Sequence, residues 1–276
     1  MASYNNAIAS ALPDGRAALV VAHPGHELRV FHWLRLARPC VFVLTDGSGR
    51  SGKSRLHSTT RILEQNKAYR GCIYGRHTDR EIYRALIEHE VDLFLNLVQE
   101  LAAALVRERI DYVVGDAIEG YNPSHDLCRA IINSAVEIAS HERDCDLLNF
   151  EVMLTSEPED HALAKSEGAL LLDLDDDHVS HKIEVALGYS ALAAYVRLNL
   201  RNYGVGAFQT ECLRPARSHL SSYEFSETPY YELYGERQVA AGHYQNVLRY
   251  RQHVLPVIQA LQDFAKPVGR RAACAY

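Results

Sequence analysis

The sequence predicts an α/β fold, a Rossmann-like three-layer sandwich with a mainly parallel sheet and a helical C-terminal extension. Two observations favour this class. Short apolar runs, typical of buried strands, alternate along the chain with longer segments of helical periodicity. These runs are continuously apolar, as expected of parallel strands that helices cover on both faces.

Each element follows from one of these two patterns. The predicted strands cover residues 17–22, 40–45, 72–74, 110–115, 147–154 and 169–174. The predicted helices cover residues 28–36, 54–66, 92–107, 178–200 and 236–264, the last interrupted near Pro256. Parallel sheets bind ligands at the carboxyl ends of their strands, so the loops after Ala22, Thr45 and Gly115 are expected to form the site.

Length and composition fit one main domain. We expect a metal-hydrolase domain over residues 1–220 and a helical extension over residues 221–276 packed on it. The chain is 47% hydrophobic and 23% charged, as in globular proteins with a real core. Its net charge of -6 argues against nucleic acid as a partner, which would require a basic face.

Compartment and membrane association are judged from sequence signals. No apolar run of about 18 residues exists, so no membrane span is expected. The first residues lack the basic and apolar regions of a signal peptide. The six cysteines form no CxxC pair and mostly lie in apolar stretches, which predicts reduced, mainly buried thiols and a cytoplasmic location.

Two histidines three positions apart follow the first predicted strand. His23 and His26 stand in a strand-to-helix turn, and neutral imidazole is a favoured ligand of Zn²⁺. Catalytic zinc sites use three protein ligands and water, and His125, after the strand at 110–115, is the natural third. Because zinc–nitrogen bonds are about 2 Å long, the rings should lie within about 6 Å of one another.

The run Ala-His-Pro-x-x-Glu at residues 22–27 resembles the signature of the LmbE-like zinc deacetylases, Ala-His-Pro-Asp-Asp-Glu. That family includes the N-acetylglucosaminyl-phosphatidylinositol and mycothiol-pathway de-N-acetylases. Further landmarks occur in a similar order over roughly residues 15–215: Thr45-Asp46-Gly47, a loop ending at His125, Ser180-His181-Lys182 and Glu211-Cys212-Leu213. The resemblance implies hydrolysis of an N-acyl group on an amino sugar or a related small polar amide, with Zn²⁺ as cofactor.

The resemblance also assigns roles to single residues. His23, His26 and His125 match the family's three zinc ligands, although the family has Asp at the second position. Gly25 stands where the family has its general base, and Asn122 where it has an auxiliary histidine. Glycine cannot accept a proton. Three neutral ligands would leave the ion its full charge and make its bound water more acidic, so the water would depend less on a base.

A carboxylate from another loop is expected to replace the missing base. Glu119 and Asp46 are the preferred candidates, because both follow strands whose ends face the predicted metal. Asp116 and Glu27 are alternatives. Each of these acids is also suited to capping a turn or a helix.

Further polar residues are candidates for contact with the substrate. Asn122 can donate a hydrogen bond to an oxyanion. Arg50, Arg55 and Lys182 are predicted to bind the substrate, which for the two arginines would be anionic. A solvated helix start explains Arg50 and Arg55 about equally well.

A competing motif occupies residues 47–54, Gly-Ser-Gly-Arg-Ser-Gly-Lys-Ser. It matches the P-loop pattern Gly-x4-Gly-Lys-Ser, whose amides cradle phosphates while Lys53 and Ser54 would serve the outer oxygens and magnesium. Asp116 then resembles a Walker B aspartate. This hypothesis gives the three histidines no role, so the zinc hydrolase is preferred over the nucleotide enzyme.

Two further alternatives remain open. The fold could have altered or lost hydrolysis, or the protein could bind a ligand without turnover. A group of tyrosines near the C-terminus suits a ring-bearing substrate or, as we prefer, the packing of the extension or a homo-oligomer interface. The group comprises Tyr223, Tyr230, Tyr231, Tyr234, Tyr244 and Tyr250.

Overall fold

Seven strands form one sheet in the computed structural model, which describes residues 12–154, 167–217, 225 and 227–266. The strand order is β3-β2-β1-β4-β5-β7-β6. Neighbours from β3 through β5 run parallel, whereas β7 is antiparallel to both β5 and β6. The strands are β1 (Ala17–Val21), β2 (Cys40–Thr45), β3 (Tyr69–His77), β4 (Tyr112–Asp116), β5 (Leu148–Val152), β6 (Leu170–Asp173) and β7 (Thr210–Pro215).

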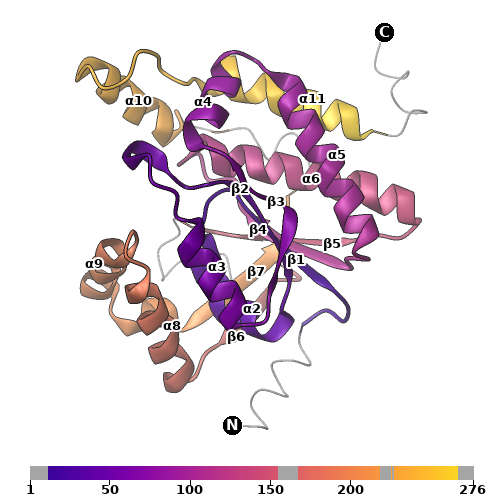
Figure 1. The fold of residues 1–276 in the computed structure, drawn as a ribbon, viewed down its shortest axis with the longest axis vertical. Coiled ribbons are helices and arrows are strands. Elements are labelled where there is room, and N and C mark those ends of the chain that lie inside the picture. The colour runs from indigo at the N-terminus through magenta and orange to yellow at the C-terminus, as the bar shows by residue number, and fades with distance from the viewer. Residues whose placement is uncertain (1–11, 155–166, 218–224, 226, 267–276) are drawn as a thin grey trace.

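Helices cover both faces of this sheet (Figure 1). The α-helices are α2 (Phe31–Ala37), α3 (Leu56–Gln65), α4 (Asp79–Ile87), α5 (Val91–Arg107), α6 (Pro123–Arg143), α8 (Asp176–Gly188), α9 (Ala193–Tyr203), α10 (Tyr230–Ala240) and α11 (Leu255–Ala265). Shorter helical turns are η1 (His26–Val30), η2 (Gly49–Ser51), η3 (Val205–Phe208) and the π-helical η5 (Tyr250–Val254).

The two faces of β1 explain the layers. Ala18 and Val20 belong to an apolar cluster with α5, α6 and α11, whereas Leu19 and Val21 belong to a second cluster with α2 and α3. Alternate side chains of a strand point to opposite faces, so a fully buried strand needs helices on each. The predicted three-layer α/β sandwich is therefore confirmed.

The strand order places the loops after β1 and β4 together. From β1 the sheet continues to β2 on one side and to β4 on the other, and the strand order reverses between β1 and β4. Crevices at such a reversal are where open α/β sheets bind ligands. The carboxyl end of β2 lies beside that of β1, so all three predicted loops share one edge of the sheet.

Two predicted helices are wrong in extent. The helix expected over residues 178–200 is two helices, because the backbone at Tyr189 is extended and ends α8. The helix expected over residues 236–264 ends in α10 at Ala240, and helical backbone resumes only at Tyr250. In both cases the apolar periodicity continues through the segment between the two helices. The backbone nevertheless turns there, in a stretch that contains polar residues or glycine.

Three elements were not predicted: β7, α4 and α6. Strand β7 lacks an apolar run because its buried Glu211 and Arg214 form ion pairs with Lys182 and Glu151, at 2.7 and 2.6 Å. Helix α6 does carry a start signal, Asn122 as N-cap followed by proline at the first helical position.

The C-terminal segment shares the main core. Helix α11 packs on α5 and α6, and Val254, Val257, Ile258 and Leu261 belong to the same apolar cluster as β1. Among the described residues, no helix has both the length and the apolar character needed to cross a bilayer.

The cysteines differ in part from the prediction. The five described ones are free thiols, and Cys40 and Cys128 are buried. Cys72 and Cys145 are exposed, which corrects the expectation that the thiols are mainly buried. Tyr223 and Cys274 lie outside the described residues.

Candidate active site

Three histidine rings meet at the carboxyl edge of the sheet. The ring centroids of His23 and His26 are 5.2 Å apart, those of His23 and His125 5.2 Å, and those of His26 and His125 4.7 Å. All three separations are below the expected 6 Å. Within the described residues, no group of three or more His, Cys, Asp or Glu side chains already has the arrangement of a metal site. Rotation of an imidazole about its side-chain bonds moves its nitrogen atoms without moving the backbone, so rings at these distances can be brought onto one ion.

His23 follows β1 and is almost fully buried. Its Nδ1 lies 2.8 Å from the Thr45 hydroxyl and 3.0 Å from Oδ1 of Asp79. Because the Thr45 hydroxyl donates its own proton to the Ala22 carbonyl, it accepts from His23, which places the proton on Nδ1. Burial lowers the pKa of His23, so the ring is neutral. Nε2 then carries a lone pair, and it is buried and makes no hydrogen bond to any described residue.

His26 is held in the same way by Asp116 at the end of β4. Its Nδ1 lies 2.8 Å from Oδ2 of Asp116, and the same oxygen accepts the backbone N–H of Ala22 at 2.7 Å. Burial alone would raise the pKa of Asp116, but His26 outweighs it and the pKa falls to about 2. Asp116 is therefore a carboxylate that accepts the Nδ1 proton of His26.

His125 enters the site from the first turn of α6. Asn122 caps this helix, its Oδ1 accepting the N–H of Ser124 at 2.9 Å, and Pro123 occupies the first helical position. Burial, and after it the proximity of the two other imidazoles, lowers the pKa of His125, so its ring is neutral. Its Nδ1 is buried and has no hydrogen-bond partner in the part of the chain that the structure describes.

Asp79 belongs to the site and was not predicted. It opens α4, where Thr78 and Glu81 form a capping box, and its Oδ2 accepts the N–H of Gly49 at 2.5 Å. Burial would raise the pKa of Asp79, but the contact with His23 lowers it further than burial raises it. The sequence does signal the start of this helix, since a Thr-x-x-Glu box follows β3, but it does not signal the contact of Asp79 with His23.

Packing around Gly25, the position at which the resembled family has its general base, leaves no room for a side chain. Gly25 has a φ of 107°, a conformation that side chains rarely adopt. A Cβ atom added there would stand 2.5 Å from Cδ1 of Leu192, in the turn between α8 and α9. A carboxylate at this position would therefore need both a strained backbone and a displaced Leu192.

The acids suggested as replacement bases all bind backbone or hydroxyl groups. Glu27 is fully buried and accepts the Gly25 N–H and the Thr59 hydroxyl, each at 2.7 Å. Asp46 accepts the N–H of Ser48 at 2.9 Å. Glu119 accepts the N–H of Leu154 at 2.9 Å. These bonds hold the loops that form the edge of the site.

The predicted substrate-binding residues fall into two groups. Arg50 is exposed and reaches Gln238 of α10 at 3.4 Å, while Arg55 donates to the Gly47 carbonyl at 2.7 Å. Lys182 is buried, and its ammonium donates to Glu211 at 2.7 Å and to the Arg29 carbonyl at 3.0 Å. The assignment of Lys182 to the substrate is thus corrected, because this buried ion pair fixes α8 to the sheet.

The glycine-rich loop does not have the form of a P-loop. A P-loop needs backbone amides directed at phosphate, whereas here the N–H groups of Ser48, Gly49 and Gly52 already donate to protein oxygens. Helix α3 begins at Leu56, beyond the expected Lys53 and Ser54, and no side chain caps it. The loop instead packs against Pro24, beside His23.

The tyrosines divide into a buried and an exposed set. Tyr231 and Tyr250 are buried and pack in the core. Tyr121, 48% exposed, stacks on Tyr230 of α10, 44% exposed, with ring centroids 5.0 Å apart and planes inclined by 6°. Tyr121 directly precedes Asn122, so this exposed stack stands beside the helix start that carries His125.

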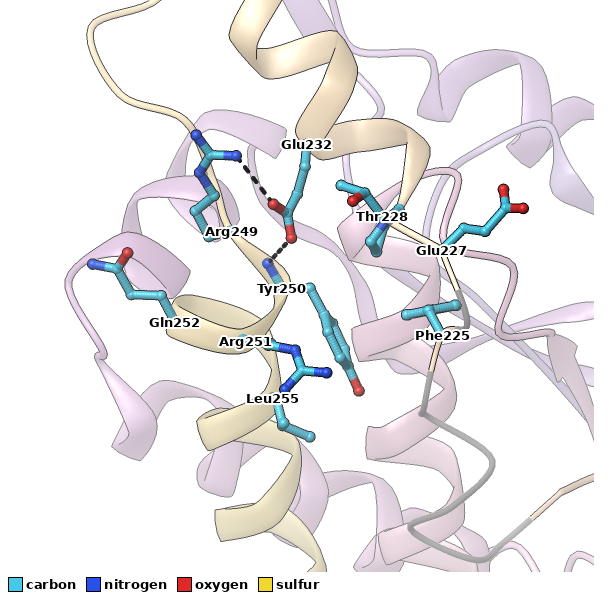
Figure 2. Close-up of a pocket in the computed structure, with 10 residues that line it drawn as sticks. Phe225, Glu227, Thr228, Glu232, Arg249, Tyr250, Arg251, Gln252 and Leu255 are labelled. Carbon is cyan, nitrogen blue, oxygen red and sulfur yellow. Dashed lines mark hydrogen bonds and ion pairs between the residues drawn. The ribbon is translucent and has the colours of Figure 1, made fainter.

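A separate cavity of about 710 Å³ lies among α10, η5 and the start of α11 (Figure 2). Glu232 accepts hydrogen bonds from Arg249 and from the N–H of Tyr250 across it. None of the three clustered histidines lines this cavity. Its Glu232 and Arg249 neutralise one another, so we place the candidate active site at the histidines.

Comparisons with known proteins find solved structures with a similar backbone fold and low sequence identity. No protein-family model matches the chain, and no curated protein does. The zinc-inhibited form of teicoplanin deacetylase Orf2 matches with a TM-score of 0.49 and 12% identity, over 74% of this chain and all of that one. The conserved protein TT1542 from Thermus thermophilus matches with a TM-score of 0.47 and 14% identity, over 74% of this chain and 95% of that one. A triple mutant of Orf2, a deacetylase of the teicoplanin biosynthetic pathway, gives 0.44 and 14%, over 74% and 98%.

Proposed function

We propose that this protein is a zinc-dependent hydrolase that removes an N-acyl group from an amino sugar or a related small polar amide. His23, His26 and His125 would hold the ion. The observation that carries the proposal is the set of three clustered imidazoles, two of which keep a buried nitrogen without a hydrogen bond among the described residues. Leaving a buried polar atom unpaired costs about 1–3 kcal/mol, which a bound cation would offset.

The donor chemistry fits Zn²⁺. Metal-binding histidines typically donate their second ring N–H to a carboxylate, and His23 and His26 lie 3.0 and 2.8 Å from Asp79 and Asp116. Three imidazoles and one open position are a common catalytic zinc set. When bound, Zn²⁺ would polarise the amide carbonyl and acidify water at this site.

The chain's own residues would orient and protect this chemistry. Asp79 and Asp116 keep the protons of His23 and His26 on Nδ1, so that Nε2 of each ring is a donor atom. Asn122 uses its Oδ1 in the helix cap, and its Nδ2 would donate to the oxygen of the reacting carbonyl. Glu119 and Asp46, each fixed by a backbone amide, are the proposed acceptors of the proton that the attacking water loses.

The exposed edge of the site supports this substrate class. Tyr121 and Tyr230 present an exposed stacked pair beside the start of α6, suited to a sugar or other ring. The hydroxyl of Tyr83 donates to Oδ1 of Asn122 at 3.3 Å and so supports the helix cap beside this pair. A small ring-bearing substrate would then extend from the histidines toward α10.

One observation favours a second candidate, a zinc-binding protein that has lost hydrolysis. Gly25 lacks the family's base and Leu192 fills the space before it. Three of the alternative acids also serve loop structure. This candidate shares the metal site and differs in turnover.

Metal analysis and an acyl-release assay separate these outcomes. We expect about one zinc per dialysed chain, absent in His23→Ala and His125→Ala and retained in His57→Ala, which removes an exposed histidine of α3. Zinc-loaded protein should release free amine from N-acetylated amino sugars. Zinc retained by all variants would refute the site. Zinc bound without any amine released would refute hydrolysis and support the second candidate.

A further inference from the structure

A second pair of histidines lies away from the proposed zinc site, between α2 and α8. The rings of His32 and His178 have centroids 4.5 Å apart and are inclined by 76°. His32 is 2% exposed, and both its ring nitrogens are buried without a hydrogen bond in the described part of the chain. Buried polar atoms are rarely left in this state, so the pair calls for an explanation.

The ring of His32 is suited to bind a cation. A neutral imidazole has one N–H and one nitrogen with a lone pair. Burial lowers the pKa of His32, which keeps that lone pair unprotonated at neutral pH. A bound cation would occupy one of two buried nitrogens that otherwise make no hydrogen bond to the described residues.

The ring of His178 is already oriented by a carboxylate. Its Nδ1 lies 2.6 Å from Oδ1 of Asp175, and the same oxygen caps α8 by accepting the His178 N–H at 2.9 Å. This is the arrangement that Asp116 makes with His26. It leaves Nε2 of His178 as the nitrogen with a lone pair, which is typical of a metal-binding histidine.

Charges of both signs surround the two rings. Arg35 and Lys182 act on His32 as positive charges, and Glu211 as a negative one. Lys182 is itself paired with Glu211 at 2.7 Å. Asp176 and Asp177, in the first turn of α8, add negative charge on the side of His178.

We propose that His32 and His178 form a second site for a divalent transition metal such as Zn²⁺, with Asp175 orienting His178 and water completing the coordination. The ion would join α2 to α8. Tyr189 and Leu192, which follow α8, lie against Gly25 in the loop of His23 and His26, so this site would stabilise one wall of the first. Two protein ligands make it weaker than a three-histidine site.

Zinc titration of chelator-treated protein, by calorimetry and equilibrium dialysis, tests the proposal. We expect two classes of site, the weaker absent in His178→Ala and in His32→Ala. His181→Ala is the matched control, because it removes a more exposed histidine of the same helix and should retain both classes. Asp175→Ser keeps a good N-cap residue but loses the carboxylate, and should weaken the second site by about 10- to 100-fold.

The experiment tests the two proposed sites separately. His23→Ala should lose the tighter class and keep the weaker one. A single class of zinc site in the unmodified protein, or a weaker class that persists in His178→Ala, would overturn the proposal whether or not the first site and its hydrolysis hold. Because His178 is partly exposed, its variant is informative even where His32→Ala does not fold.

Discussion

The Nδ1 atom of His26 lies 2.8 Å from Oδ2 of Asp116, and the same oxygen accepts the backbone N–H of Ala22 at 2.7 Å. One buried carboxylate thus joins the end of β4 to the first residue after β1 and fixes a histidine ring. The site geometry and the packing of two central strands therefore depend on the same side chain.

Asp116→Asn should weaken zinc binding by about 10- to 100-fold, as expected when a carboxylate that orients a metal-binding histidine is lost. The amide can turn its NH2 group as well as its oxygen toward Nδ1, so it no longer fixes the proton of His26 on that nitrogen. Competition with a zinc chelator measures the change. Asp111→Asn, just before the other end of β4, is the control and should leave zinc affinity unchanged. Equal affinity in the Asp116 variant would show that the pair has no role in metal binding.

Gly25→Ala should destabilise the protein by about 1–3 kcal/mol, because it forces a side chain into a φ of 107° and against Leu192. Urea unfolding measures the change. In the double variant with Leu192→Ala, the part due to contact should vanish and the backbone part should remain. If Gly25→Ala is neutral, the loop is more adaptable than its packing indicates, and a base could be restored there.

The sequence predicted the strands and the edge of the sheet better than it predicted the ends of the helices. The strands at residues 17–22, 40–45 and 110–115 were recognised because buried parallel strands are continuously apolar, and their order along the chain brought His23, His26 and His125 to one edge. Helix ends were less predictable, since the apolar pattern of α8 and α9 continues through the turn at Tyr189. The break lies where the backbone of Tyr189, directly after Gly188, is extended.

Contacts between distant segments account for the remaining differences. Lys182 looked available to a substrate, but Glu211, 29 residues later, pairs with it inside the protein. Asp79 was overlooked because it joins the site through a contact with His23, which lies far earlier in the chain. The residues next to Asp79 in the sequence do not indicate this contact. Such pairings depend on the tertiary fold and have no signature in spacing or composition.

Lys53→Ala should leave stability within about 0.5 kcal/mol of the unmodified protein, since Lys53 is exposed and outside any helix. It should also leave magnesium-dependent nucleotide binding at background, because the loop amides that a phosphate would need are occupied by Asp46, Asp79 and Ser48. Equilibrium dialysis with ATP and Mg²⁺ checks both proteins. Tight ATP binding that Lys53→Ala abolishes would restore the P-loop hypothesis.

The stability of the protein should fall above pH 9 through Cys40. Burial raises the pKa of this thiol from 9.0 to about 12. Below pH 9 both states keep the proton, so the free energy of unfolding does not depend on it. Between pH 9 and 12 the unfolded state loses the proton while the folded state retains it, so the free energy of unfolding decreases as pH rises. Urea unfolding at pH 8 to 11 should show a shallower decline in Cys40→Ala, with Cys145→Ala, which removes an exposed thiol, matching the unmodified protein.

Tyr230→Ala should raise KM for an N-acylated amino sugar by about 2- to 12-fold and leave kcat unchanged, the loss expected for one aromatic stacking contact of about 0.5–1.5 kcal/mol. The reason is position: Tyr230 stacks on Tyr121, at the edge of the site and away from the three histidine rings. Tyr230→Phe retains the ring and should retain KM. Tyr203→Ala, which removes a similarly exposed tyrosine at the end of α9, is the control for general surface effects. A fall in kcat with KM unchanged would place Tyr230 in the chemical step, and no change in either would assign the stacked pair to packing or to an interface between chains.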